Sequence, residues 1–206
     1  MSQGQPPTLP IQNLLAKPES EVTTAAEPSQ EVDSDMDANR ERHETHSSFR
    51  ETVVEHLLLA QLLARAWHEG RVIEVARAET DQFGYDLVLT EGRFTRHVQV
   101  KASAVWAKTS NQTVHTTLQS KPSPCIVWVV VKDGQTALEI DHFLFFGGAA
   151  GEPMPDLGEV KGVHPRGKNE RPATRKVKKS RFHRVETTDD LMAELFGHAA
   201  DRQPAH

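Results

Sequence analysis

The clearest pattern of apolar and polar positions lies between Asp81 and Ser103. Apolar and polar residues alternate on both sides of Glu91-Gly92-Arg93, which predicts two β-strands joined by a tight turn. Because successive side chains point to opposite faces of a strand, the second strand has two different faces. One face carries Thr95, His97, Gln99 and Lys101, and the other carries Phe94, Arg96, Val98 and Val100.

Pairing in this hairpin has a chemical consequence. Asp86 opens the first strand, and antiparallel pairing places the start of that strand beside the end of the second. Gln99 and Lys101 share one face of the second strand. We therefore expect an acid, an amide oxygen and an ammonium group to converge at one end of the hairpin.

The segment before the hairpin predicts a helix of about twenty residues. It is expected to begin at Ser47 or Ser48, with Glu51 completing a capping box, and to end at Gly70. Steps of about 100° per residue give this helix a polar face and a core face. The polar face holds Arg50, Gln61, Arg65 and His68. The expected core face holds Phe49, Val53, Leu57, Ala60, Ala64 and Trp67.

Glu55 does not join the polar face of this helix. Helical spacing puts it beside Leu59, Leu62 and Ala66, on an apolar side. A carboxylate that loses its water without a partner costs several kcal/mol, so Glu55 requires a cation, a metal or hydrogen-bond donors. A helix-edge carboxylate that reaches water, or a structural salt bridge, stays open as the simpler interpretation.

The rest of the chain predicts an α/β fold, a mixed sheet flanked by helices. Residues 71–78 alternate as a strand, residues 125–131 form an apolar run typical of a strand buried on both faces, and residues 136–140 form another strand. The remaining expectations are a short helix late in residues 104–120, an apolar segment at 141–146, a long loop at 147–174, an edge strand within 175–185, and a last helix capped by Thr187 or Thr188 and followed by Gly197.

Composition adds domain boundaries and a location. The first 46 of the 206 residues contain five prolines, nine acids and no aromatic residue, so a disordered acidic tail is expected there. The domains that follow are a core at 47–146, a basic extension at 147–185, and a short helix with a frayed end at 186–206. A single cysteine, Cys125, and the lack of a long apolar run or a secretory signal predict a cytoplasmic protein with no membrane partner.

Residues 161–184 hold ten Lys or Arg residues against one acid, Glu170. Such a segment is either a solvated face or an arm that follows the phosphates of a nucleic acid. The second interpretation assigns phosphate contacts to Ser103, Lys168, Arg175, Lys176, Lys178, Lys179 and Arg181. Trp106 is expected to pack in the core, with stacking on a base as the alternative.

Three local strings support a resemblance to a known family. They are Phe-Gly-Tyr-Asp-Leu at 83–87, Val-Gln-Val-Lys-Ala-Ser at 98–103 and Pro-Cys-Ile-Val-Trp-Val-Val-Val at 124–131. Over residues 48–146 the chain resembles the PD-(D/E)xK nuclease superfamily, in particular its restriction-endonuclease-like, Holliday-junction-resolvase-like and DUF4365-type members. The resemblance implies a restriction-endonuclease-like α-β-β-β-α-β core and a metal-dependent phosphodiesterase site.

The resemblance also implies roles for individual residues. Asp86, Gln99, Lys101 and Glu55 fill the catalytic positions, and Mg²⁺ or Mn²⁺ is expected to bind Asp86, Gln99, Glu55 and the Val100 carbonyl. Lys101 then holds the attacking water and stabilises the phosphorane oxygens. Gln99 departs from the family pattern, because an acid is commoner there and an amide removes one negative charge from the metal site.

The function expected from these features is that of a Mg²⁺-dependent endonuclease acting on DNA. A nuclease-fold module that binds DNA or protein without catalysis stays open because of Gln99, and so does an RNA-directed nuclease. The sequence does not settle the oligomeric state, so a homodimer also stays open.

Overall fold

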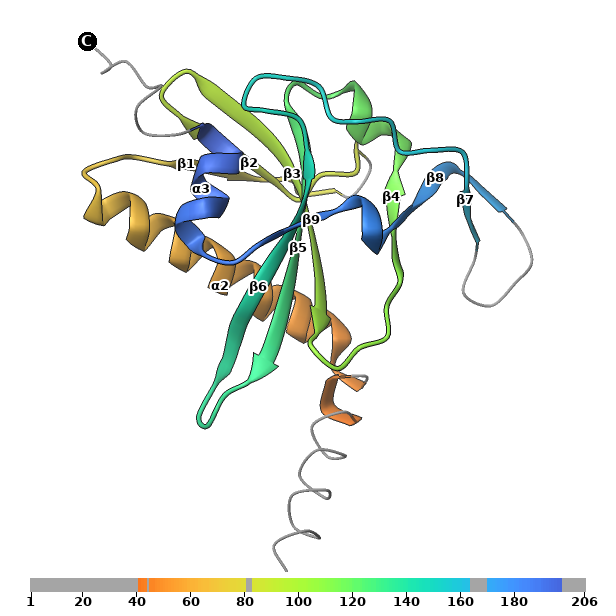
Figure 1. The fold of residues 1–206 in the computed structure, drawn as a ribbon, viewed down its shortest axis with the longest axis horizontal. Helices are drawn as coiled ribbons and strands as arrows, with labels where there is room; N and C mark the ends of the chain where they lie inside the picture. Colours follow the sequence, from red (N-terminus) through yellow and green to blue (C-terminus); the bar gives the residue numbers. More distant parts are fainter. Residues whose placement is uncertain (1–40, 44, 81–82, 164–169, 198–206) are drawn as a thin grey trace, which may run out of the picture. The chain divides into compact units, whose positions relative to one another are not determined.

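The computed structural model describes residues 41–43, 45–80, 83–163 and 170–197 (Figure 1). They form an α/β unit with a mixed six-stranded sheet, a separate three-stranded sheet and the α-helices α2 and α3, which confirms the α/β class. Its elements are α2 (Ser47–His68), β1 (Glu74–Arg77), β2 (Leu87–Glu91), β3 (Phe94–Ala104), β4 (Asn111–His115), the 3₁₀ helix η2 (Thr116–Ser120), β5 (Pro124–Asp133), β6 (Leu138–Gly147), β7 (Lys161–Val163), β8 (Glu170–Lys178), the 3₁₀ helix η3 (Lys179–Arg181), β9 (His183–Val185) and α3 (Thr188–Phe196). Among the described helices, none is both long and apolar enough to cross a membrane.

The large sheet has the strand order β1-β2-β3-β5-β6-β9. The predicted hairpin is confirmed as β2 and β3, which pair with Leu87 opposite Val98 and turn through Gly92 at φ 55°. β3 and β5 run parallel, whereas the other neighbouring strands of this sheet run antiparallel. A parallel pair needs a crossover connection, which here leaves β3 and returns to β5.

That crossover corrects the expected α-β-β-β-α-β order. In place of an α-helix it contains β4 and the short η2. β4 pairs with β8, which in turn pairs with β7, so β8 is the central strand of the small sheet. The edge strand expected within 175–185 is confirmed as β9, which lies at one edge of the large sheet. The predicted loop at 147–174 contains β7, and the apolar segment at 141–146 belongs to β6.

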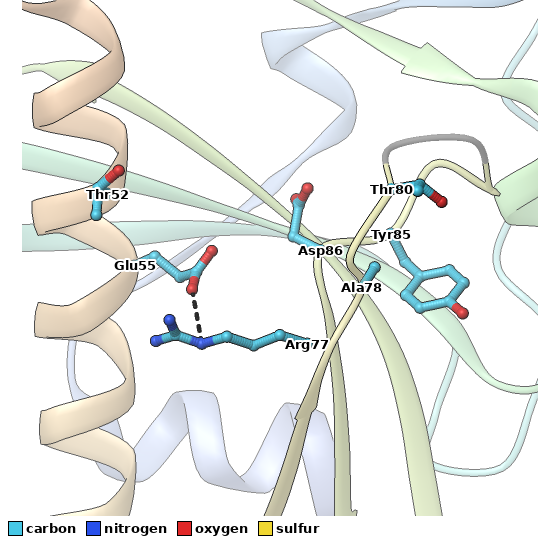
Figure 2. A pocket seen from close by; sticks show the side chains of 7 residues that line it. All are labelled: Thr52, Glu55, Arg77, Ala78, Thr80, Tyr85 and Asp86. Atoms are coloured by element: carbon cyan, nitrogen blue, oxygen red, sulfur yellow. Dashed lines mark ion pairs between the residues drawn. The ribbon is translucent and has the colours of Figure 1, made fainter.

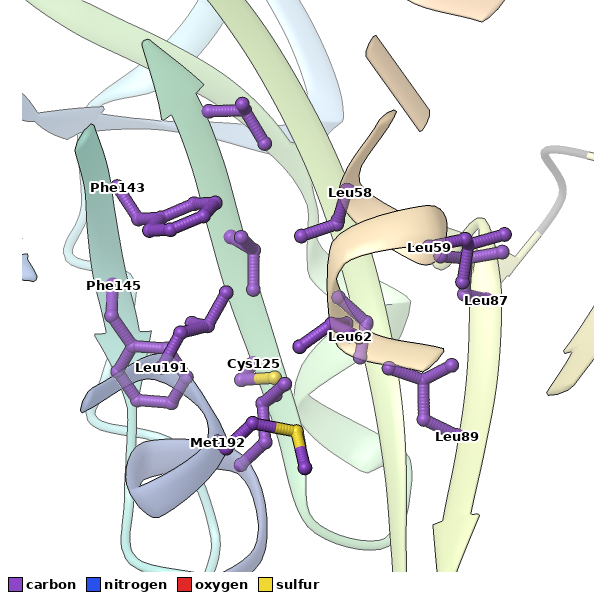
Figure 3. Close-up of a cluster of buried hydrophobic side chains, with 14 of the residues drawn as sticks. Leu58, Leu59, Leu62, Leu87, Leu89, Cys125, Phe143, Phe145, Leu191 and Met192 are labelled. Carbon is purple, nitrogen blue, oxygen red and sulfur yellow. The ribbon is translucent and has the colours of Figure 1, made fainter. Parts of the chain in front are cut away.

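Two apolar cores lie on opposite faces of the large sheet. α2 and α3 cover one face, where Leu58, Leu62 and Leu191 pack against strand residues such as Phe143 (Figure 3). The small sheet and η2 cover the other face. That second core includes Val114, Leu118, Ile126, Trp128 and Val177. Residues 125–131 of β5 are at most 2% exposed, which confirms the predicted strand buried on both faces.

The predicted core face of α2 is wrong. Phe49 is 70% exposed and Trp67 86% exposed, whereas the buried face holds Val54, Leu58, Leu59, Leu62 and Ala66. Apolar residues lie on both sides of this helix, so spacing alone did not identify the side that meets the sheet. The predicted capping is also wrong, because His46 occupies the N-cap and no side chain caps the helix.

The two ends of the described chain differ in how well they were predicted. α3 begins as expected, with the Thr187 side chain accepting a hydrogen bond from the Asp190 amide (3.1 Å). Residues 41–43 are helical, and His43 is 5% exposed with Nε2 3.1 Å from Asp133 Oδ2. The structured part of the chain therefore begins before residue 46, the expected end of the disordered tail. Residues 1–40 of that tail lie outside the described residues.

Arg96 is fully buried on β3 and ties three parts of the chain together. Its guanidinium donates to the Leu195 carbonyl at the end of α3 (2.8 Å), to Ser123 Oγ (3.0 Å) and to the Gly148 carbonyl (2.9 Å). Carbonyls at a helix C-terminus carry partial negative charge, so the guanidinium stabilises this end of α3. Burial lowers the pKa of Arg96 from its ordinary value.

Candidate functional site

The site lies beside the first residue of β2, Leu87, where the pairing of β2 with β3 stops. β3 is 11 residues long and β2 only five, so β3 has no β2 partner beyond Val98. Asp86, the residue before β2, lies at this point. Its amide donates to the Val98 carbonyl (2.9 Å), and its Oδ2 accepts from the Val100 amide (2.6 Å). These two bonds fix the Asp86 carboxylate at the uncovered edge of β3.

A cleft of about 500 Å³ lies along this edge. α2 contributes Ser48, Glu51, Thr52 and Glu55 to its lining, β3 contributes Val100, Lys101 and Ala102, β4 contributes Asn111, Gln112 and Thr113, and Asp86 completes the lining. The cleft therefore brings together the predicted residues Glu55, Asp86 and Lys101. Their convergence depends on where the pairing of β2 with β3 stops, because a longer β2 would cover the edge of β3 that the cleft follows.

A smaller pocket of about 310 Å³ shares Thr52, Glu55 and Asp86 with the cleft and adds Arg77 from β1 (Figure 2). Glu55 extends from α2 toward the strands, where its Oε1 lies 3.3 Å from Arg77 Nε. The cation that the position of Glu55 requires is therefore supplied by Arg77. This ion pair is the structural alternative that the sequence left open.

Gln99 is placed differently from the other predicted site residues. Gln99 follows Val98, the last β3 residue that is paired with β2, but its side chain is 3% exposed and does not line the cleft. Its Oε1 is buried and has no hydrogen-bond partner among the described residues. Buried polar atoms are almost always paired, so this oxygen is available to accept a hydrogen bond or to bind a cation.

Lys101 lies on the cleft side of β3 and is partly buried. Within the described part of the chain it has no ion-pair partner, whereas Arg77 is engaged by Glu55. An ammonium group without a counter-charge attracts an anion. The cleft thus presents the carboxylates of Glu51, Glu55 and Asp86 together with one ammonium group that is held in no described ion pair.

The donor atoms give a mixed result for a metal. In the described ranges no group of three His, Cys, Asp or Glu residues is arranged to hold a metal ion. The oxygen donors are of the kind that Mg²⁺ accepts with several waters, namely the Asp86 carboxylate and the Val100 carbonyl. In an extended strand the N–H and the C=O of one residue point to the same edge, so the Val100 carbonyl faces the edge at which its amide donates to Asp86.

The residues predicted to contact nucleic acid are only partly near the cleft. Lys176 pairs opposite Thr113 and Lys178 opposite Asn111, and both β4 residues line the cleft. The prediction for Ser103 is wrong, because Ser103 is buried and its Oγ accepts a hydrogen bond from Trp128 Nε1 (2.9 Å).

Three other basic residues of that prediction have separate outcomes. Arg175 donates to the Pro172 carbonyl (2.8 Å), and the Arg181 guanidinium lies 5.0 Å from the Phe146 ring centroid. Lys168 lies outside the described residues. Trp106, whose role the sequence left open, packs edge-on against His43 at 5.4 Å between ring centroids.

Sequence reasoning missed Glu51, Arg77 and Asn111 as residues of the site. Glu51 was assigned to a helix cap, although its spacing of four residues from Glu55 places both carboxylates on one side of a helix. That spacing was a usable signal. Asn111 had none, since its position depends on the pairing of β4 with β8.

No protein-family model matches the chain, and no curated protein matches its sequence.

Proposed function

We propose that this protein is a metal-dependent nuclease that hydrolyses DNA phosphodiester bonds. The observation that carries the proposal is the cleft at the uncovered edge of β3, where Asp86, Glu55 and Lys101 meet. The element order also supports it. α2, the antiparallel strands β1, β2 and β3, and then β5 parallel to β3 follow the restriction-endonuclease-like order, apart from the missing crossover helix.

Asp86 and the Val100 carbonyl would hold a divalent cation, with Glu55 and the unpaired Gln99 oxygen as further donors. Such a cation, when bound, activates water and neutralises charge that develops on phosphate. The chain itself supplies the orientation, because the Val100 amide fixes the Asp86 carboxylate. Lys101 supplies a positive charge that stabilises the oxygens of the pentavalent phosphorus.

A second candidate is a nuclease-fold module that binds DNA without cutting it. Two observations favour it: Glu55 is engaged by Arg77, and Gln99 is buried away from the cleft lining. Both remove donors from a metal site. The two candidates share the lysines Lys176 and Lys178 of β8. They differ in whether Asp86 takes part in chemistry.

A substrate panel tests the proposal. The purified protein is incubated with linear, nicked, flapped and junction DNA and with matched RNA, in Mg²⁺, in Mn²⁺ and in EDTA. The nuclease proposal predicts cleavage of at least one DNA substrate that EDTA abolishes. Cleavage of RNA in preference to DNA would show that the substrate is RNA. Binding of DNA without cleavage in either metal would favour the second candidate.

A further inference from the structure

A basic groove of about 580 Å³ lies beside the cleft, between the chain segment that precedes β4 and the end of β8. Its lining consists of Ala107, Lys108, Thr109, Ser110, Asn111, Lys178, Lys179 and Ser180. The two walls are joined by a hydrogen bond from the Lys179 amide to the Ser110 carbonyl (2.8 Å) and by the pairing of Asn111 with Lys178. The groove is therefore built on paired strands.

The groove continues the cleft. Asn111 lines both hollows, so a chain lying along the cleft past β4 would enter the groove next. Lys178 stands directly opposite Asn111, at the point where the two hollows meet. A polymer that fits one hollow is thereby led to the other.

The charges in the groove are uncompensated. Its described lining holds three lysines and no acidic residue. Lys108 and Lys178 have no ion-pair partner within the described ranges, and Lys179 Nζ lies 5.6 Å from the centroid of the Trp128 ring. By contrast, Lys161 on β7 is paired with Glu170 at 2.7 Å. Ammonium and hydroxyl groups with no carboxylate among them are suited to phosphate.

We propose that this groove binds the phosphodiester backbone of the nucleic-acid strand that occupies the cleft. The cleft's part in this rests on the proposed function, whereas phosphate binding by Lys108 and Lys178 does not. No aromatic side chain belongs to the described lining, so the groove contacts phosphates and does not stack on bases. Binding in the groove is therefore independent of base sequence.

Single charge removals test the groove. Lys108→Gln, Lys178→Gln and the control Lys161→Gln each remove one positive charge, and the control lies in the same basic region but is paired with Glu170. Affinity for a fluorescent DNA duplex is measured by anisotropy in EDTA across a salt series. Each groove variant is expected to lower the slope of log affinity against log salt by about 0.9, and affinity at 0.1 M salt by about eightfold. Lys161→Gln is expected to leave both nearly unchanged.

The outcomes separate the groove from the nuclease proposal. The groove proposal is overturned if the groove variants keep the wild-type affinity and the wild-type slope of log affinity against log salt. It is also overturned if the protein binds no nucleic acid in this assay. A preference for one of two duplexes of different sequence would overturn its sequence independence. If the groove variants weaken DNA binding as expected but the protein cuts no substrate, the groove proposal is retained and the nuclease proposal is rejected. A matched RNA duplex reports whether the groove distinguishes the two backbones.

Discussion

Replacing Gln99 with Met tests what the buried amide does. Gln99 is 3% exposed and its Oε1 has no partner among the described residues, and a buried polar atom left unpaired costs about 1–3 kcal/mol. Met has a similar length, no polar oxygen and a flexible chain that fills irregular space. In the absence of metal, Gln99→Met is therefore expected to raise the free energy of unfolding by about 1 kcal/mol.

With added Mg²⁺, the wild type should have a higher free energy of unfolding than Gln99→Met. A cation that binds only the folded protein raises the free energy of unfolding by about 2.7 kcal/mol at 100 times its dissociation constant. If the Gln99 oxygen is a ligand, the wild type gains this stabilisation and Gln99→Met loses most of it.

Urea denaturation with and without Mg²⁺, followed by tryptophan fluorescence, measures both effects. The exposed turn variant Gln135→Met is the control. A loss of more than about 1 kcal/mol without metal would show that the amide is hydrogen-bonded in solution and refute the reasoning. Equal Mg²⁺ stabilisation of Gln99→Met and wild type would remove Gln99 from the metal site.

Three further predictions concern stability and reactivity. Arg96→Met strips several buried acceptors of their donor and should lower the free energy of unfolding in urea by about 2–4 kcal/mol, a loss that Lys at this position would not restore. Burial raises the pKa of the Cys125 thiol to about 12, so Cys125 should react with a thiol reagent only at the rate of opening, and fast reaction in the native protein would contradict its burial. A hydrogen bond from His142, with Lys132 nearby, holds the pKa of Asp141 below its ordinary 3.8. The stability from this lowered pKa is present above pH 3.8 and is lost as the pH falls through the folded value, so Asp141→Asn should destabilise the protein at pH 7 and progressively less as the pH falls below 3.8.

The parts of the fold that local patterns determine were predicted well. The alternation around Gly92 predicted the β2–β3 hairpin, and the unbroken apolar run at 125–131 predicted the central strand. The buried face of α2 was not predicted, because the large apolar residues Phe49 and Trp67 lie on its outer side. Which side meets the sheet depends on the position of the strands, which helix periodicity does not contain.

The candidate site divides in the same way. Alternation put Gln99 and Lys101 on one face, and pairing put Asp86 beside them. Alternation did not show that Gln99 is buried, whereas Lys101 lines the cleft together with residues of β4 and α2. β4 itself escaped prediction since it contains a single buried apolar residue, Val114, and its partner β8 lies far along the chain. Contacts between distant segments leave no local pattern in a sequence.

The central claim is that the Asp86 carboxylate supports metal-dependent cleavage. The most direct measurement is the single-turnover cleavage rate of a preferred DNA substrate in Mg²⁺, compared between wild type, Asp86→Asn and the control Asp156→Asn. Asp156 is exposed, accepts a hydrogen bond from the Gly158 amide (2.6 Å) and does not line the cleft. The carboxylate is expected to supply several kcal/mol through the metal, so Asp86→Asn should lower the rate by at least about 100-fold, while Asp156→Asn cuts at the wild-type rate. Wild-type cleavage by a folded Asp86→Asn variant would contradict the account.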